Sequence, residues 1–447
     1  MGLFDRLRGG DGPRVAFLGI DGVPYRLIEA HPDVFEHLHA LIDTGAGGPI
    51  DSIVPPESSA CWPSLTTGVN PGQTGVYGFQ DREIGSYETY VPMGRDVQAT
   101  RIWDRVHEAG MEATVMNVPV TFPPQRNIQR MVSGFLSPDV EKAAHPPEVG
   151  ASLQRSGYRI DVDAKLGHES DKGPFLADAH DTIEARRDAF LSYIEQDDWD
   201  LFFGVFMTTD RVNHFLFEEY ETDGPDAEAF LEFYRTVDQY IGELHDALPD
   251  DVTTIVASDH GFTTLEYEVH CNHWLAEEGW LSFESDAHEQ LMDIDDSTVA
   301  YSLIPGRFYL NLEGREPRGS VPRDAYAETL DELADAIRGL TGPNGEPVID
   351  RVIRGQDVFV GDHVDIAPDL VALPHDGFDL KAGFGSGSAV FDRGPRSGMH
   401  TFADATFITD DPAVDVSDAD LFDIAPTILD LMDIGYDDAA VDGASLT

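Results

Sequence analysis

Three aspartates in this sequence stand directly after apolar segments. Asp21 ends "FLGID", Asp210 ends "GVFMTTD" and Asp259 ends "IVASD". If these segments are strands of one open α/β sheet, their carboxyl ends meet at one crevice, where ligands bind in such sheets. Three carboxylates packed together raise one another's pKa unless cations lie between them. The pattern therefore predicts a cation site at this edge of the sheet.

Two histidines give that site its chemical character. His214 stands four residues after Asp210, so on a helical turn both share one face and can bind one ion. His260 directly follows Asp259. Imidazole together with carboxylate suits Zn or Mn better than Ca. Each piece alone is common, because an aspartate after a strand is often a helix cap or turn residue, so the inference depends on their joint occurrence.

A hydroxyl-rich stretch, "VPPESSACWPSLTTG" (54–68), offers several candidate nucleophiles. Gly68 and the "NPG" turn after it predict the end of a short helix over 59–67, with Ser58 at or near its N-cap. A serine there is often only a cap. The same position also lies beside free backbone N–H groups and the positive end of the helix dipole, which favour the binding of a phosphate. A bound metal would lower the pKa of such a hydroxyl. We expect Ser59 to face elsewhere, the later hydroxyls to bond to helix carbonyls, and the cysteine to pack in the core.

Apolar patterning predicts the elements that must position these residues. Six apolar runs are typical of buried parallel strands, namely 14–20, 113–118, 201–207, 253–258, 369–373 and 405–409. Helical periodicity is clearest over 181–196 and 229–248. Alternating strands and helices predict a doubly wound α/β sheet.

One long stretch interrupts this alternation. It contains "HCNHWLAEEGWLSF", "GRFYLNLEGREP" and the helix-like "AYAETLDELADAIRGL". We interpret 264–355 as a cap inserted over one edge of a core formed by 12–263 and 356–447. Residues 1–11 form a short amphipathic N-terminal tail, which we expect to be frayed rather than bound to a membrane surface.

The composition limits the environment and the partners. The 447 residues carry 83 acidic against 29 basic side chains, a formal charge of −54, and four of the basic residues are lysines. This surface favours a cytosol with molar salt, as in halophilic archaea, where self-repulsion is screened; an acidic protein of an ordinary cell is the alternative. Duplex nucleic acid and anionic membranes are poor partners for it. Two cysteines, no secretory signal and no long apolar run predict a cytoplasmic protein without stable membrane insertion, and its oligomeric state is open.

The motifs taken together resemble a known family. The ordered series "GIDG", "PPESSACWPSLTTGVNPGQTGVYGF", "TTDRVNHF", "SDHGF" and "SGMH" is similar to the alkaline phosphatase superfamily, and within it to the type I phosphodiesterase/nucleotide pyrophosphatase branch. The resemblance extends over nearly the whole chain. It implies an alkaline-phosphatase-like three-layer α/β/α core with a mostly parallel sheet and an inserted cap. In that branch the nucleophile stands ten residues before the glycine of the Thr-Gly pair, which here selects Ser58.

The resemblance further implies a metal-dependent phosphoester hydrolase, most closely a phosphodiesterase or nucleotide pyrophosphatase that acts on a small phosphoester through a phosphoserine intermediate. It implies two divalent ions, with Zn²⁺ expected and Mn²⁺ as the alternative. One ion would be held by Asp210, His214 and His400, and the other by Asp21, Ser58, Asp259 and His260. His400, in "RSGMHTF", is selected by the resemblance alone. The cap, together with the 140–180 segment, would set the substrate, which the sequence leaves open.

The sequence departs from the family pattern near the expected phosphate. Thr74 stands where a histidine is usual, and Phe79 stands where eukaryotic nucleotide pyrophosphatases carry an asparagine that binds a phosphate oxygen. Nucleotide substrates are therefore in doubt. Gln80, Asn117 and Arg211 are candidates for binding the phosphate instead, although each is also typical of an ordinary strand-end or surface polar residue.

Four other functions stay open on the sequence. A phosphomonoesterase shares the metal core, and Arg211, Arg393 and Arg396 lie close in sequence to the proposed ligands and suit a dianionic end group. A sulfatase needs C/S-x-P-x-R, but "CWPSL" has Leu65 where the arginine is required. A phosphoglycerate-mutase-like enzyme needs more basic residues for its substrate. A non-catalytic metal-binding protein predicts lost ligands, whereas all seven positions of the implied site carry competent residues.

Overall fold

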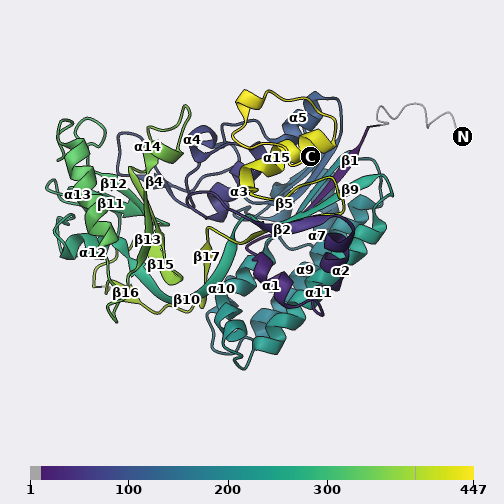
Figure 1. The fold of residues 1–447 in the computed structure, drawn as a ribbon, viewed down its shortest axis with the longest axis horizontal. Helices are drawn as coiled ribbons and strands as arrows, with labels where there is room; N and C mark the ends of the chain where they lie inside the picture. The colour runs from purple at the N-terminus through teal and green to yellow at the C-terminus, as the bar shows by residue number, and fades with distance from the viewer. Residues whose placement is uncertain (1–11, 388) are drawn as a thin grey trace, which may run out of the picture.

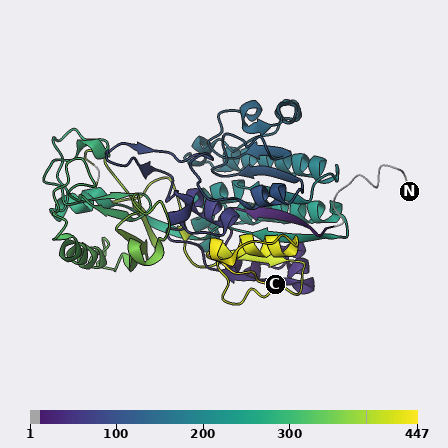
Figure 2. The same cartoon turned by 90° about the horizontal axis from the view of Figure 1, so that it is seen from above.

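The computed structural model describes residues 12–387 and 389–447. Within them the chain forms two lobes, a larger α/β core and a smaller lobe built mainly from residues after 260 (Figure 1). The lobes lie side by side in two perpendicular views (Figure 2). The tail expected over 1–11 lies outside the described residues.

The core is organised around an eight-stranded sheet. In spatial order its strands are β2 (Ala46–Ile50), β18 (Ala405–Thr409), β9 (Val252–Ala257), β1 (Arg14–Ile20), β8 (Leu201–Phe206), β5 (Ala113–Val118), β6 (Arg130–Ser133) and β7 (Ala144–His145). The run from β9 through β1, β8 and β5 to β6 is parallel. The flanking strands β18 and β7 pair antiparallel with this run. The expected mostly parallel sheet is therefore confirmed.

Helices cover both faces of this sheet, because successive side chains of the central strands are apolar and point to opposite faces. In β1, Leu18 and Ile20 pack into one apolar core, and Val15 and Phe17 pack into the other. The first core is closed by α1 (Tyr25–Ala30), α2 (Glu36–Thr44), α7 (Pro147–Ser156), α9 (Gly173–Ile194), α10 (Thr208–Glu221) and α11 (Ala227–Ala247). The second is closed by α3 (Ser58–Thr67), α5 (Ile102–Glu108) and α15 (Ile424–Leu431). The result is the expected three-layer α/β/α arrangement.

The smaller lobe has its own antiparallel sheet and apolar core. Its sheet has the order β11 (Ala300–Leu303), β12 (Arg307–Leu310), β14 (Leu370–Pro374) and β13 (Ile349–Arg354). The helices α12 (Cys271–Glu277) and α13 (Tyr326–Arg338) contribute to the same apolar core. The hairpin of β3 (Asp81–Arg82) and β4 (Thr89–Tyr90) reaches this lobe from the core segment and places Tyr87 in that apolar core.

A third sheet connects the two lobes. Strand β10 (Gly261–His270) begins four residues after β9, and its first half pairs with β17 (Gly398–Thr401). Its second half pairs with β15 (Gly377–Lys381) and β16 (Phe391–Asp392). The chain therefore leaves and re-enters the core along neighbouring strands, which brings residues near 260 and 400 together.

Short helical turns complete the described fold. They are α4 (Pro71–Thr74), α6 (Val140–Ala143), α8 (Ala164–Gly167), α14 (Gly355–Val358) and 3₁₀ turns at 291–293, 421–423 and 438–440. Over the two described ranges, no helix combines the length and the apolar composition that a membrane span requires.

Two of the six predicted strands differ in their pairing. The run 369–373, expected in the core sheet, is β14 of the smaller lobe and is antiparallel to its neighbours. The run 405–409 forms β18 in the central sheet, but antiparallel to β9, because the chain enters it from β17 rather than through a crossover helix. A short apolar run identifies a buried strand without identifying its partner.

Since β14 to β16 pair with strands after 260, we propose that the inserted region extends beyond 355, to about residue 392.

Candidate active site

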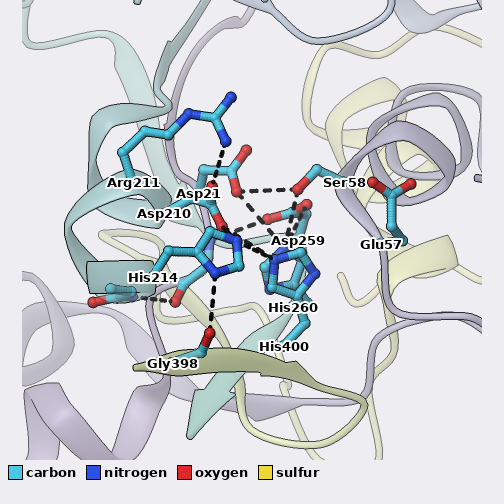
Figure 3. Close-up of polar contacts among 12 residues, drawn as sticks. Asp21, Glu57, Ser58, Asp210, Arg211, His214, Asp259, His260, Gly398 and His400 are labelled. Carbon is cyan, nitrogen blue, oxygen red and sulfur yellow. Dashed lines mark hydrogen bonds and ion pairs between the residues drawn. The ribbon is translucent and has the colours of Figure 1, made fainter. Parts of the chain in front are cut away.

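The seven residues expected at a metal site meet at the carboxyl edge of the central sheet (Figure 3). They come from five places in the fold, which are Asp21 after β1, Ser58 at the start of α3, Asp210 and His214 in α10 after β8, Asp259 and His260 between β9 and β10, and His400 in β17. Six of them are buried and His400 is half-buried. The convergence predicted from strand ends is therefore present in the structure.

One group of potential ligands surrounds Asp210. Nε2 of His400 lies 3.2 Å from Asp210 Oδ1 and 3.1 Å from Nε2 of His214. Nε2 of His214 lies 3.3 Å from the same carboxylate oxygen. Two imidazole nitrogens and one carboxylate oxygen thus face a common point.

The second group surrounds His260. Ser58 Oγ lies 3.1 Å from His260 Nε2 and donates to Asp21 Oδ1 over 3.4 Å. His260 Nε2 also lies 3.7 Å from Asp21 Oδ1 and 3.5 Å from Asp259 Oδ2. In two sets of three residues, Asp21–Asp259–His260 and Asp210–His260–His400, potential ligand atoms lie within 4.8 Å of one another. His260 is common to both sets, so the two groups are adjacent.

Backbone carbonyls orient all three imidazole rings. Nδ1 lies 3.0 Å from Gly398 O in His214, 3.0 Å from Gly261 O in His260 and 3.2 Å from Pro56 O in His400. Because a carbonyl oxygen only accepts, each Nδ1 carries a proton and each Nε2 is turned toward the site. The Nε2 atoms of His214 and His400 therefore require a proton or a metal ion between them.

Burial makes charge costly at this site. It raises the pKa of Asp21 well above its usual range, and the charges of Asp259 and Asp210 raise it further. Burial also raises the pKa of Asp259, and it lowers the pKa of His260 to about 3, so that this ring stays neutral. Asp259 Oδ2 is buried and has no hydrogen-bond partner in the described part of the chain. A bound divalent cation would compensate both the unpartnered oxygen and the clustered carboxylates, so the donor set fits a metal centre.

Helix α3 presents Ser58 at its N-terminus. Its N-cap is Glu57, whose carboxylate accepts from Ser59 N over 3.1 Å, so Ser58 is the first helical residue rather than the expected cap. Gly68 ends the helix in the left-handed conformation, as predicted. Ser59 and Ser58 both line the cavity in front of the metal-site residues, contrary to the expectation that Ser59 faces elsewhere. Ser58 Oγ is nevertheless the hydroxyl that contacts the aspartate and histidine of the second group.

Other side chains of α3 have structural roles. The hydroxyls of Thr66 and Thr67 donate to helix carbonyls over 2.7 Å, as expected. The same expectation is wrong for Ser64, whose Oγ is buried and has no hydrogen-bond partner among the described residues. Cys61 is buried, and burial raises the pKa of its thiol well above the usual range, which disfavours a thiolate nucleophile. Trp62 is fully buried, and it donates from Nε1 to Asp21 Oδ2 over 2.8 Å. No sequence pattern indicates this contact, because it joins two elements that only the fold brings together.

A cavity of about 530 Å³ opens in front of these residues, between the core and the smaller lobe. This volume suits a small organic ligand. The core contributes Ser58, Asp210, His214, Phe79, Phe135 and Met207 to its walls, and the inserted region and the returning chain contribute Ile304, Leu373, Leu380, Lys381, Arg396 and His400. The inserted lobe therefore encloses the site on one side, as a cap would.

Of the three candidates for binding phosphate, Arg211 is the one that lines this cavity. Its guanidinium forms ion pairs with Asp210 and with Asp161, a residue that the sequence did not indicate. Asp161 carries no motif and lies between α7 and α8, so only the fold reveals the contact.

Gln80 and Asn117 are not among the residues that line the cavity. Asn117 is fully buried, and its amide bonds to the Val205 carbonyl and the Tyr158 hydroxyl over 3.3 Å each. Gln80 Nε2 donates to Thr89 Oγ1 over 2.6 Å. Both amides thus form hydrogen bonds within the protein.

Comparisons with known proteins agree with this architecture. A family model described as type I phosphodiesterase/nucleotide pyrophosphatase matches residues 15–402. Among solved structures, phosphonoacetate hydrolase from Sinorhizobium meliloti, in complex with phosphonoformate, is 17% identical with a TM-score of 0.63, covering 94% of this chain and 96% of that chain. Murine ectonucleotide pyrophosphatase/phosphodiesterase 5 is 14% identical with a TM-score of 0.57, covering 97% of each chain. At these identities the structural likeness establishes the fold, and no curated protein sequence matches the chain.

Proposed function

This chain belongs to the type I phosphodiesterase/nucleotide pyrophosphatase family, and from that premise we propose that it is a phosphodiesterase that uses two divalent metal ions and Ser58 as nucleophile. Family membership makes it a hydrolase of phosphate ester bonds. One observation carries the finer proposal. Ser58 Oγ, at the first residue of α3, lies 3.1 Å from His260 Nε2 and 3.4 Å from Asp21 Oδ1 on the wall of the cavity.

The donor atoms of this chain suit two ions. Asp210, His214 and His400 would hold one, and Asp21, Ser58, Asp259 and His260 would hold the other. Carboxylate and imidazole donors without thiolate favour Zn²⁺, with Mn²⁺ as the alternative. When bound, the ions would lower the pKa of the serine hydroxyl and neutralise the charge that develops on the phosphoryl oxygens.

Ser58 Oγ would attack phosphorus in line, and the ester bond to the departing alcohol would break as the new bond forms. The N-terminus of α3 supports this step, because its backbone N–H groups and the positive end of its dipole favour developing negative charge. The product is a phosphoserine that keeps the second ester group. Water then displaces Ser58 from phosphorus, so two inversions give net retention.

The cavity walls indicate the organic part of the substrate. Phe79, Phe135 and Leu373 line it, and its volume of about 530 Å³ exceeds what one phosphate needs. We therefore propose a small phosphodiester that carries an apolar or aromatic group. The high negative charge of the chain favours a cellular environment with molar salt. Activity should therefore be assayed at molar salt.

Phosphomonoester hydrolysis is the second candidate function. Arg396 lines the cavity, within electrostatic reach of Asp379. A guanidinium at the cavity wall suits the second charge of a monoester.

Turnover by the purified protein in molar KCl tests the proposal. The metal is removed with a chelator and restored as Zn²⁺ or Mn²⁺, with bis(4-nitrophenyl) phosphate and 4-nitrophenyl phosphate as substrates. We expect diester hydrolysis that disappears with the metal and returns with it, and a larger kcat/KM for the diester than for the monoester. Activity confined to the monoester would contradict the phosphodiesterase assignment.

A further inference from the structure

Arg211 lies between two carboxylates at the edge of the active-site cavity. Its Nε and Nη2 donate to Asp161 Oδ2 over 3.2 and 3.1 Å. Its Nη1 donates to Asp210 Oδ2 over 3.3 Å on the opposite side. The guanidinium carbon lies 4.6 Å from the centre of the Phe135 ring, which fixes the plane of the group. The side chain is 15% exposed, and Figure 3 shows it above Asp210.

Asp161 is itself held in place. Its second oxygen accepts from Val162 N over 2.9 Å. The preceding backbone is tied to α9, since Arg186 Nη2 donates to Ile160 O over 2.6 Å. Nη1 of the same arginine donates over 3.3 Å to Oγ1 of Thr208, the first residue of α10. Asp161 is thus fixed relative to α10, the helix that carries Asp210, Arg211 and His214.

Asp161 determines how much charge Arg211 offers to a substrate. A guanidinium stays protonated in proteins. Its charge is compensated by Asp161, which accepts from two of its N–H groups, whereas Asp210 would also be a ligand of a metal ion. Of its five N–H groups three are engaged, and two remain that can orient one phosphate oxygen.

Monoesters and diesters differ in the charge that this site must balance. A phosphodiester carries one negative charge, whereas a phosphomonoester carries nearly two near neutral pH. A guanidinium whose charge is already compensated can orient the oxygen of either ester, but it gives the dianion little additional stabilisation.

We propose that Asp161 is a specificity-determining residue, which positions Arg211 and neutralises its charge so that the site prefers phosphodiesters to phosphomonoesters. This inference rests on the proposed function of the same site. Asp161 acts through Arg211 and is therefore a positioning residue rather than a catalytic one.

The ratio of kcat/KM for 4-nitrophenyl phosphate to that for bis(4-nitrophenyl) phosphate tests this proposal, measured on the metal-loaded enzyme in molar KCl. Asp161→Asn keeps an acceptor for Arg211 but removes one negative charge, so we expect the ratio to rise about tenfold. The rise should come mainly from a lower KM for the monoester. Asp161→Glu keeps the charge and should return the ratio toward that of the wild type.

Two further variants complete the test. Asp163→Asn is the matched control, because Asp163 lies two residues away, is exposed, and accepts from Lys165 N rather than from Arg211. It should leave the ratio unchanged. Arg211→Gln leaves Asp161 without its cation, and it should move the ratio in the opposite direction to Asp161→Asn.

The outcomes separate this inference from the proposed function. A ratio that is unchanged or lower in Asp161→Asn overturns the inference, and so does an equal loss of activity on both esters, which indicates a purely structural role. A wild-type enzyme that cleaves neither ester when loaded with metal contradicts the proposed function instead. Metal content and thermal unfolding, measured on each variant, establish that the compared proteins are folded and loaded.

Discussion

Trp62 Nε1 donates a hydrogen bond of 2.8 Å to Asp21 Oδ2, and both side chains are fully buried. The indole also packs edge-on against Phe17 and Phe203 of the central sheet, at centroid distances of 6.4 and 6.5 Å. The helix that carries Ser58 therefore also orients a carboxylate that follows β1. Ser58 and Asp21 are held by one packed unit.

Replacing Trp62 with phenylalanine removes this hydrogen bond and keeps most of the aromatic packing. Partners that orient metal ligands affect affinity strongly, so we expect Trp62→Phe to weaken Zn²⁺ binding about 10- to 100-fold. Competition with a chromogenic chelator measures this. Trp103→Phe is the matched control, because Trp103 is equally buried and loses a hydrogen bond to Gln125 away from the site. Equal Zn²⁺ affinity in both variants would show that the Trp62 contact does not orient a ligand.

Arg307 connects the smaller lobe to the β3–β4 hairpin. It is fully buried in β12, forms an ion pair with Asp81, and donates to Gln80 O over 2.5 Å and Ile304 O over 2.8 Å. Arg307→Met leaves Asp81 buried without its partner, so we expect the free energy of unfolding to fall by about 3–5 kcal/mol. Denaturant titration in molar KCl measures it.

The control for Arg307 is an exposed ion pair. Arg338 pairs with Asp335 over 2.7 Å on the surface of α13. Arg338→Gln should cost less than about 1 kcal/mol, because exposed pairs are hydrated and screened. Similar losses in both variants would mean that burial does not distinguish the two pairs.

Asp420, which lies away from the active site, makes the stability of the fold depend on pH. Burial, together with the charges of Asp423 and Asp51, raises its pKa to about 6. Because this lies above the unfolded value of about 3.9, the native state binds the proton more tightly, and the stabilisation from this group is lost as pH rises from about 4 to about 6. Asp420→Asn keeps an acceptor for Phe422 N, and it should be more stable than the wild type above pH about 6.

Thermal unfolding at constant KCl and varied pH checks the sign of this effect. Asp415 provides the opposite case, because hydrogen bonds from Ser417 lower its pKa, so its contribution is present above the unfolded pKa and is lost as pH falls. Asp415→Asn should therefore not raise the unfolding temperature near neutral pH. An Asp420→Asn variant that is less stable than the wild type at pH about 8 would contradict a raised pKa of Asp420 in the native state.

The formal charge of −54 predicts a strong salt dependence of stability. The Debye length falls from about 10 Å at 0.1 M to about 3 Å at 1 M salt, which screens the repulsion among surface carboxylates. We expect the unfolding temperature to rise steeply with KCl up to molar concentration. Sucrose stabilises by exclusion without screening charge, so it should not substitute for KCl at low ionic strength. Equal stability at low and molar KCl would contradict a halophilic protein.

Much of the core could be predicted from the sequence, because apolar runs and helical periodicity are local signals. The strands at 14–20, 113–118 and 201–207 lie where they were expected, apart from one residue at the end of the third. The pairing of 369–373 and 405–409 could not be predicted, since any strand buried on both faces gives the same pattern. Partner and direction depend on the path of the chain through the smaller lobe.

Some residues of the candidate site could likewise be predicted from the sequence pattern, and others could not. Asp21, Asp210 and Asp259 could be placed together because the ends of parallel strands share one edge of a sheet. Ser58 and His400 needed the family resemblance, since hydroxyls and histidines recur along the chain. Contacts that join distant segments, such as those of Trp62 and Asp161, leave no pattern in the sequence.

Hydrolysis of bis(4-nitrophenyl) phosphate by Ser58→Ala and Ser59→Ala, each loaded with Zn²⁺ and compared with the wild type, tests the central claim most directly. Both serines line the cavity, but Ser58 Oγ is the one that contacts His260 and Asp21. We predict that Ser58→Ala loses at least about a thousandfold in kcat while it keeps its fold and most of its metal, and that Ser59→Ala stays within a few-fold of the wild type. A Ser58→Ala enzyme that remains active, with Ser59→Ala inactive, would contradict Ser58 as the nucleophile.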